Sequence, residues 1–152
     1  MENYEINEDT LAVIGNMYGN TKIIEKEKEY EVSKRAYEIM DENCEYYGSS
    51  YNGRLKASKK MLDCSYKLPI LMEESSMLIF LPTKSSLLDD CIWINYNAIK
   101  SSKKQGTKML INLINNQELE IDISELSLKN QIYRGAKLES IARKRMIGTK
   151  KE

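Results

Sequence analysis

Short apolar runs separated by polar turns occupy most of the chain, and this pattern is typical of β-strands. Such runs predict strands at residues 4–6, 11–18, 21–32, 68–72, 77–81 and 91–99. The alternating Glu and Lys of residues 21–32 indicate a solvent-exposed edge strand or hairpin. In residues 108–123, two strand-like runs flank Asn115 and Asn116, which predicts a hairpin with a polar two-residue turn.

Apolar positions at helical spacing predict helices at residues 33–48, 54–62 and 127–146, with Ser33 and Ser124 as N-caps. Gly135 lies inside the last helix, where glycine costs about 1 kcal/mol relative to alanine, so we expect close packing or a bend there. The predicted fold is an α+β domain. It contains a mainly antiparallel sheet, two mid-chain helices around a Gly/Ser loop, and a basic C-terminal helix.

The length of 152 residues predicts one domain, which we place at residues 1–147, with residues 148–152 as a short basic tail. No histidine occurs, which excludes Ser-His-Asp triads, Cys-His dyads and His-containing zinc sites. Glycine-rich phosphate-binding motifs are also missing. The three cysteines match no zinc spacing, so we expect reduced core cysteines in a cytoplasmic protein. We therefore expect no enzymatic activity, no cofactor or metal, and no membrane segment.

The charges divide unevenly along a chain whose formal net charge is zero. The first 53 residues contain 12 acidic and 5 basic residues, whereas the remainder contains 11 acidic and 18 basic residues. Residues 129–151 contain eight basic residues against Glu139 alone. Such a cluster indicates a face for a polyanion, nucleic acid first, although lysines can also simply solvate a helix.

The segment from Cys44 to Arg54, C-E-Y-Y-G-S-S-Y-N-G-R, allows two interpretations. Its small residues, hydroxyls and terminal guanidinium suit a loop that faces a polyanion. The same residues also fit a helix that ends at Gly48 and a second helix that begins just beyond.

Five segments in order give the chain a resemblance to a known family. The segment Cys44–Arg54 is followed in order by K-L-P-I-L-M from Lys67, I-F-L-P-T-K-S-S from Ile79, C-I-W-I-N from Cys91 and N-Q-I-Y-R from Asn130. Together they resemble the competence transcription factor family, ComK, over residues 6–146. The resemblance favours a DNA-facing or DNA-positioning role for the Cys44–Arg54 loop.

The resemblance implies a cytoplasmic transcription activator of Gram-positive bacteria. Members bind paired A/T-rich boxes upstream of DNA-uptake genes, through the minor groove, as dimers that combine into larger assemblies. Chosen by residue type, the expected DNA-binding residues are Ser49, Ser50, Tyr51, Arg54, Lys84, Ser85, Ser86, Asn130, Gln131, Arg134, Lys137, Arg143, Lys144 and Arg145.

The resemblance also bears on degradation of the protein. The family pattern continues beyond the terminal helix with a tail that a protease adaptor recognises, whereas this chain stops at T-K-K-E. We therefore expect adaptor-controlled degradation to be lost or to use another surface.

An alternative function is a protein-binding regulator that pairs with a full-length family member without activating transcription. A third is an RNA or single-strand binder that stacks bases on some of the ten tyrosines.

Overall fold

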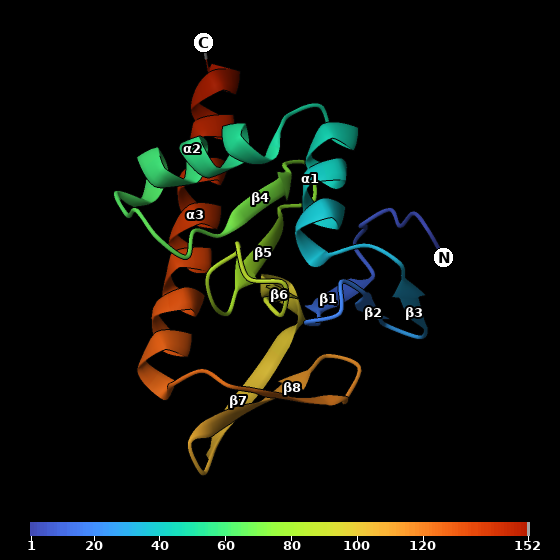
Figure 1. Cartoon of the computed structure of the whole chain (residues 1–152). Coiled ribbons are helices and arrows are strands. Elements are labelled where there is room, and N and C mark those ends of the chain that lie inside the picture. The colour runs from blue at the N-terminus through green and yellow to red at the C-terminus, as the bar shows by residue number, and fades with distance from the viewer. Residues whose placement is uncertain (152) are drawn as a thin grey trace.

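A six-stranded antiparallel sheet forms the middle layer of the protein (Figure 1). The computed structural model describes residues 1–151, with side chains through residue 148. The strands of this sheet lie in the order β3-β2-β1-β6-β5-β4. Their bounds are β1 Thr10–Gly15, β2 Thr21–Glu25, β3 Glu29–Val32, β4 Ile70–Glu73, β5 Leu78–Pro82 and β6 Ile92–Asn95.

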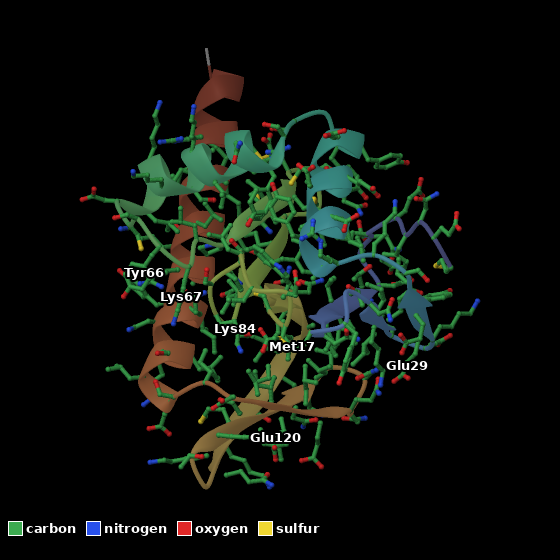
Figure 2. The ribbon with its side chains drawn as sticks, viewed as in Figure 1. Met17, Glu29, Tyr66, Lys67, Lys84 and Glu120 are labelled. Atoms are coloured by element: carbon green, nitrogen blue, oxygen red, sulfur yellow. The ribbon has the colours of Figure 1, made fainter. Side chains whose placement is uncertain are left out.

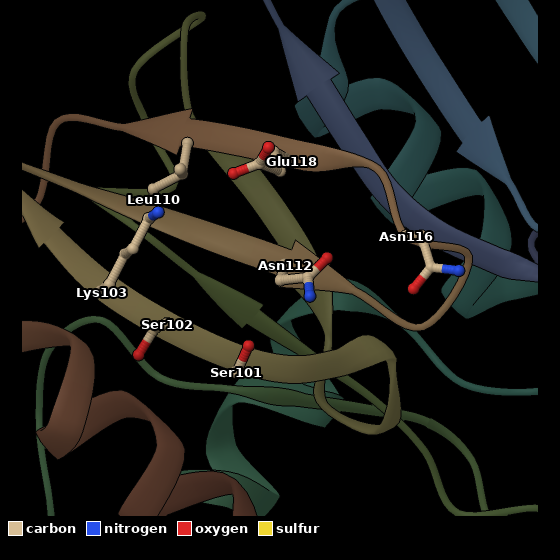
Figure 3. Close-up of a pocket in the computed structure, with 7 residues that line it drawn as sticks. All are labelled: Ser101, Ser102, Lys103, Leu110, Asn112, Asn116 and Glu118. Carbon is tan, nitrogen blue, oxygen red and sulfur yellow. The ribbon is translucent and has the colours of Figure 1, made fainter.

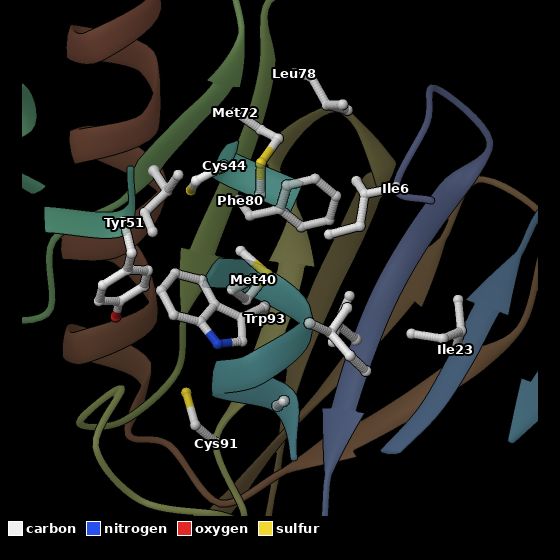
Figure 4. Packing of buried hydrophobic residues seen from close by; sticks show 14 of the residues in the cluster. Ile6, Ile23, Met40, Cys44, Tyr51, Met72, Leu78, Phe80, Cys91 and Trp93 are labelled. Atoms are coloured by element: carbon white, nitrogen blue, oxygen red, sulfur yellow. The ribbon is translucent and has the colours of Figure 1, made fainter. Parts of the chain in front are cut away.

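Both faces of the middle sheet are covered, so its central strands are apolar at consecutive positions. Val13, Phe80 and Trp93 point to one face, where helices α1 (Ala36–Tyr46) and α2 (Tyr51–Leu62) complete a buried cluster (Figure 4). Their neighbours along each strand point to the opposite face, because successive side chains on a strand alternate. This explains why runs such as I-L-M and L-I-F-L predict strands without an alternating pattern.

The opposite face is covered by a smaller sheet and by the terminal helix. The smaller sheet contains β7 (Ile99–Gln105), β8 (Lys108–Leu113) and β9 (Glu118–Ile121), and a single 3-10 turn, Tyr96–Ala98, joins β6 to β7. Helix α3 spans Glu125–Lys151. A Cβ added to Gly135 of α3 would lie 2.6 Å from Cδ1 of Tyr96, so the expected close packing at this glycine is confirmed.

The predicted α+β class is confirmed, as is the β8–β9 hairpin around Asn115 and Asn116. Ser124 caps α3, since its Oγ accepts the backbone N–H of Ser127 at 3.1 Å. Cys44 and Cys91 are buried in the core. Burial raises the pKa of their thiols to about 12 and about 11, which keeps them protonated.

Three predicted boundaries are wrong, each for a local reason. Residues 4–6 form no strand, because the Ile6 N–H donates to Oδ1 of Asn43 and its carbonyl accepts the Tyr47 hydroxyl. Helix α1 begins after Arg35 rather than Ser33, without a side-chain cap. The predicted strand 91–99 breaks at the 3-10 turn, and β7 beyond it was not predicted. Helix α3 extends through residues 148–151.

The end of β1 is packed too closely for any side chain larger than hydrogen. A Cβ at Gly15 would collide with the backbone oxygen of Asp89 and would lie 3.1 Å from Cβ of Ala36. We expect Gly15→Ala to lower the free energy of unfolding by about 2 to 3 kcal/mol, because backbone must move to relieve the overlap. Urea denaturation measures this loss.

Gly148→Ala provides the matched control, because a Cβ there meets no atom within 4 Å. This change should leave stability unaltered or slightly higher, since alanine favours helix. Equal stability of the two variants would contradict the close packing at Gly15.

Candidate nucleic-acid interface

The loop of residues 63–69, which connects α2 to β4, lies against the first half of α3 (Figure 2). Its Tyr66 side chain is exposed, and the guanidinium carbon of Arg134 lies 5.3 Å from the centre of the Tyr66 ring. This distance is within the range of a cation–π interaction. An exposed aromatic ring and an arginine are therefore held together at the surface.

Gln131 lies beneath the Tyr66–Arg134 pair and holds it in place through hydrogen bonds. Its amide Nε2 donates to the backbone oxygens of Lys67 and Pro82, and its Oε1 accepts from Nη1 of Arg134 at 2.6 Å. The side chain is buried, with 1% of the residue exposed. Gln131 is therefore a positioning residue, and the predicted direct contact with DNA is not available to it.

Two adjoining hollows meet at Ser65 and Tyr66. The first, of about 500 Å³, is lined by α3 residues Asn130, Tyr133, Arg134 and Lys137 together with residues 62–66. The second, of about 420 Å³, extends from the same loop to Ser85, Ser86 and Leu87 of the β5–β6 loop. We call this region the Tyr66 surface, defined as Tyr66, Lys67, Ser85, Ser86, Asn130, Tyr133, Arg134 and Lys137.

Six of the residues selected from the sequence line these two hollows: Tyr51, Ser85, Ser86, Asn130, Arg134 and Lys137. On α3, residues 130, 134 and 137 are spaced by four and three, which places them on one face of a helix. Lys137 Nζ donates to the Leu62 carbonyl at 3.4 Å, and it forms no ion pair with a carboxylate among the side chains through residue 148. Lys84 lies beside this region but bonds to Asp90 at 2.9 Å, which partly cancels its charge.

The Gly/Ser loop has a clear capping role. Gly48 adopts φ 87°, and the N–H groups of Gly48 and Ser49 donate to the carbonyls of Glu45 and Cys44, which closes α1. Ser50 then caps α2, since its Oγ accepts the Gly53 N–H at 2.9 Å. The capping interpretation of this loop is therefore confirmed for Gly48 and Ser50.

Tyr51 is buried at the edge of the second hollow, and Arg54 is mostly buried. Tyr51 is buried between Tyr37 and Trp93, at ring-centre distances of 4.9 and 6.4 Å, and burial raises its pKa to about 12. Its burial leaves no face of the ring for a base or a sugar. The Arg54 side chain is 15% exposed and forms an ion pair with Glu74 at 3.1 Å.

The last predicted basic cluster lies near the end of α3, away from Tyr66 along the helix. Arg143 is exposed and lies 3.7 Å from Glu139, and Lys144 is also exposed. Arg145 lines a separate hollow of about 220 Å³ with Met61 and Glu74. This cluster therefore extends the basic side of α3 without joining the Tyr66 surface.

Tyr66 and Lys67 of the Tyr66 surface were not selected from the sequence, whereas Tyr133 lies in the N-Q-I-Y-R motif, where the sequence leaves open stacking on a sugar edge or packing in the core. Tyr66 and Tyr133 are 65% and 66% exposed, which is unusual for large aromatic side chains. The sequence neighbourhood of Tyr66 contains no signal that distinguishes it from the buried tyrosines. Lys67 adopts φ 50°, which is uncommon for a residue other than glycine and is visible only in the structure.

The fold and its surface can now be compared with known proteins. A family model described as ComK protein matches residues 1–147. The chain belongs to the ComK family. A curated relative from Bacillus subtilis (strain 168), named "Competence transcription factor", is 33% identical over 144 residues, which cover 92% of this chain and 75% of the relative. These findings support a competence transcription regulator and argue against an enzyme.

No solved structure matches this ComK family member. Within the residues that the structure describes, no helix combines the length and apolar character that crossing a membrane requires.

The Ser50 cap leads to a direct prediction. Ser50→Ala should lower the free energy of unfolding by about 1 kcal/mol, because the Gly53 N–H loses its acceptor. Ser50→Asp should restore most of that stability, since an aspartate oxygen also caps a helix and its charge suits the helix N-terminus. Urea denaturation of the three proteins decides the matter. An aspartate variant no more stable than the alanine variant would contradict the capping role.

Proposed function

We propose that this chain is a DNA-binding transcription activator of competence genes, and that it recognises A/T-rich duplex through the minor groove. The observation that supports this function is the Tyr66 surface, where two exposed tyrosines surround basic and amide side chains. We further propose that the protein acts in the cytoplasm as a homodimer or tetramer.

The chemistry of the Tyr66 surface suits the minor groove of A/T-rich DNA. There an A·T pair presents only acceptors, and a narrow groove concentrates negative potential. Arg134 and Lys137 supply donors with positive charge, and the Asn130 amide adds a neutral donor. A G·C pair places a further donor in the same groove, which would face these donors unfavourably. The surface therefore favours A/T over G/C.

The remaining groups fit contacts with the DNA backbone. The hydroxyls of Ser85 and Ser86 lie at the other end of the Tyr66 surface, where they can bond phosphate oxygens and fix the position of the protein. Tyr66 and Tyr133 can pack against sugar edges beside the groove. Further along α3, Arg143 and Lys144 add electrostatic attraction that does not depend on base sequence.

The proposed groove preference is tested with three duplexes that differ only in the central box, which is A/T-rich, G/C-rich or I·C-substituted, and with a single-stranded A/T-rich oligonucleotide. Inosine lacks the minor-groove amino group of guanine, so an I·C pair resembles A·T in that groove and G·C in the major groove. We expect the I·C duplex to bind like the A/T duplex in fluorescence anisotropy titrations.

Two outcomes would overturn this proposal. Binding of I·C like G·C would exclude minor-groove reading. No duplex binding even at low salt would exclude DNA recognition by this chain alone. In that case co-purification with a full-length family member would establish the protein-binding alternative, and preference for the single strand would establish stacking on tyrosines.

Arg134 provides the sharpest variant. Arg134→Ala should weaken binding to the A/T-rich duplex by about 1–3 kcal/mol and reduce the preference over G/C, because a donor at the groove is lost. Arg35→Ala is the matched control, since Arg35 is a half-exposed arginine on the acidic N-terminal half and pairs with Glu38. Equal affinities of the two variants for the A/T-rich duplex would contradict the role of Arg134.

A further inference from the structure

The β7–β8 hairpin is a basic ribbon that the sequence analysis did not identify. Residues 100–108 read K-S-S-K-K-Q-G-T-K, with four lysines and no acidic residue. Every one of these nine residues is exposed. The hairpin projects from the body of the protein past the N-terminal end of α3 (Figure 1). It therefore presents polar and positive groups on both sides of one strand.

The hairpin is built to hold this shape. Gln105 pairs with Lys108, so only Gly106 and Thr107 form the turn. Gly106 has φ 63°, which suits the first central position of a tight two-residue hairpin turn. At its base, Ile111 and Leu113 of β8 belong to the buried cluster that joins the two sheets. A short turn and an anchored base make the ribbon a defined arm rather than a loose loop.

The charges of the hairpin are largely unneutralised. Many lysines elsewhere pair with carboxylates, as Lys26 does with Asp9 and Lys34 with Glu42. Lys103 and Lys104 make no hydrogen bond or ion pair among the side chains that the structure describes. β7 is also a sheet edge, and edge lysines can serve only to block strand pairing between molecules. The number and continuity of polar groups point to a further use.

The open face beside β7 adds neutral hydrogen-bonding groups. A hollow of about 380 Å³ is lined by Ser101, Ser102 and Lys103 of β7, with Asn112 and Asn116 from the neighbouring segments (Figure 3). Glu118 closes its far side on the β9 edge. An anion therefore meets positive charge and hydroxyls at the β7 edge and negative charge at the β9 edge. The β7 edge is the side that a polyanion can approach.

We infer that the β7–β8 hairpin is a second DNA-binding element, in which Lys103 and Lys104 contact the duplex backbone beyond the part bound by the Tyr66 surface. This inference rests on the proposed DNA-binding function. Twisted two-stranded ribbons fit into DNA grooves, and lysines on such a ribbon neutralise phosphates regardless of sequence. The hairpin then supplies affinity, while the Tyr66 surface supplies sequence preference.

The first test measures the salt dependence of binding. Lys103→Gln/Lys104→Gln should reduce the slope of log K against log salt concentration by about 1.8, because each neutralised phosphate contributes about 0.9. The A/T over G/C preference should remain that of the wild type. Lys26→Gln/Lys28→Gln, which removes two lysines from the acidic N-terminal half, should leave the slope unchanged.

An unchanged slope in the folded, non-aggregated Lys103/Lys104 double variant overturns the hairpin inference. If the wild type binds A/T-rich duplex normally in that experiment, the proposed function itself stands. If the wild type binds no duplex, both fail together. Circular dichroism establishes that the variants remain folded, and light scattering establishes that they do not aggregate.

The second test locates the hairpin on the DNA. A photo-crosslinking amino acid placed at Thr107, at the tip of the turn, should attach to DNA flanking the A/T-rich box. The same probe at Lys28, in the turn between β2 and β3, serves as the control. Crosslinking at Thr107 no greater than at Lys28 overturns the inference, even if the lysine variants lower affinity through general charge.

Discussion

One buried amide side chain holds the proposed DNA-binding surface together. Gln131 joins three parts of the chain, because it bonds the carbonyls of Lys67 and Pro82 and orients Arg134 on its own helix. The Lys67 carbonyl belongs to the loop between α2 and β4, whereas the Pro82 carbonyl belongs to the last residue of β5, which pairs with Trp93. Loss of this amide would leave both carbonyls without their donor, which costs about 1–3 kcal/mol for a buried acceptor. The proposed surface thus depends on a buried side chain beneath it.

The middle sheet explains why the functional elements lie where they do. Its first face is filled by α1 and α2, and its second face by α3 and the smaller sheet. Helix α3 and the β7–β8 hairpin therefore belong to the same layer, and Ile132 of α3 packs beside Ile99 at the start of β7. Trp93 and Phe80 anchor the opposite face, which carries no part of the basic surfaces.

Local sequence patterns predicted the helices and strands better than the contacts between them. Gly48 predicted the end of α1, because glycine tolerates the positive φ that it adopts there, whereas α2 begins at Tyr51 with Ser50 as its cap, before the predicted start at Arg54. Residues 4–6 resemble a strand, but their backbone bonds go to side chains of α1 and its C-cap. β7 lacks apolar alternation because both its faces are exposed, so no hydrophobic pattern marks it. That Ser85 and Asn130 would line adjoining hollows on either side of Tyr66 depends on the crossing of distant segments, which spacing along the chain does not encode.

The length of α3 can be compared with the length of a DNA duplex. Asn130, Arg134, Lys137 and Arg145 recur at helical spacing along one side, and Asn130 and Arg145 are separated by about 22 Å of helix axis. At 3.4 Å per base step, this length corresponds to about six or seven base pairs. One copy of the helix therefore spans less than a full turn of duplex. Under the proposed function, and with α3 along the duplex axis, a recognition box longer than this would need a second protomer in register with the first, and the spacing between boxes would then be a property of the assembly.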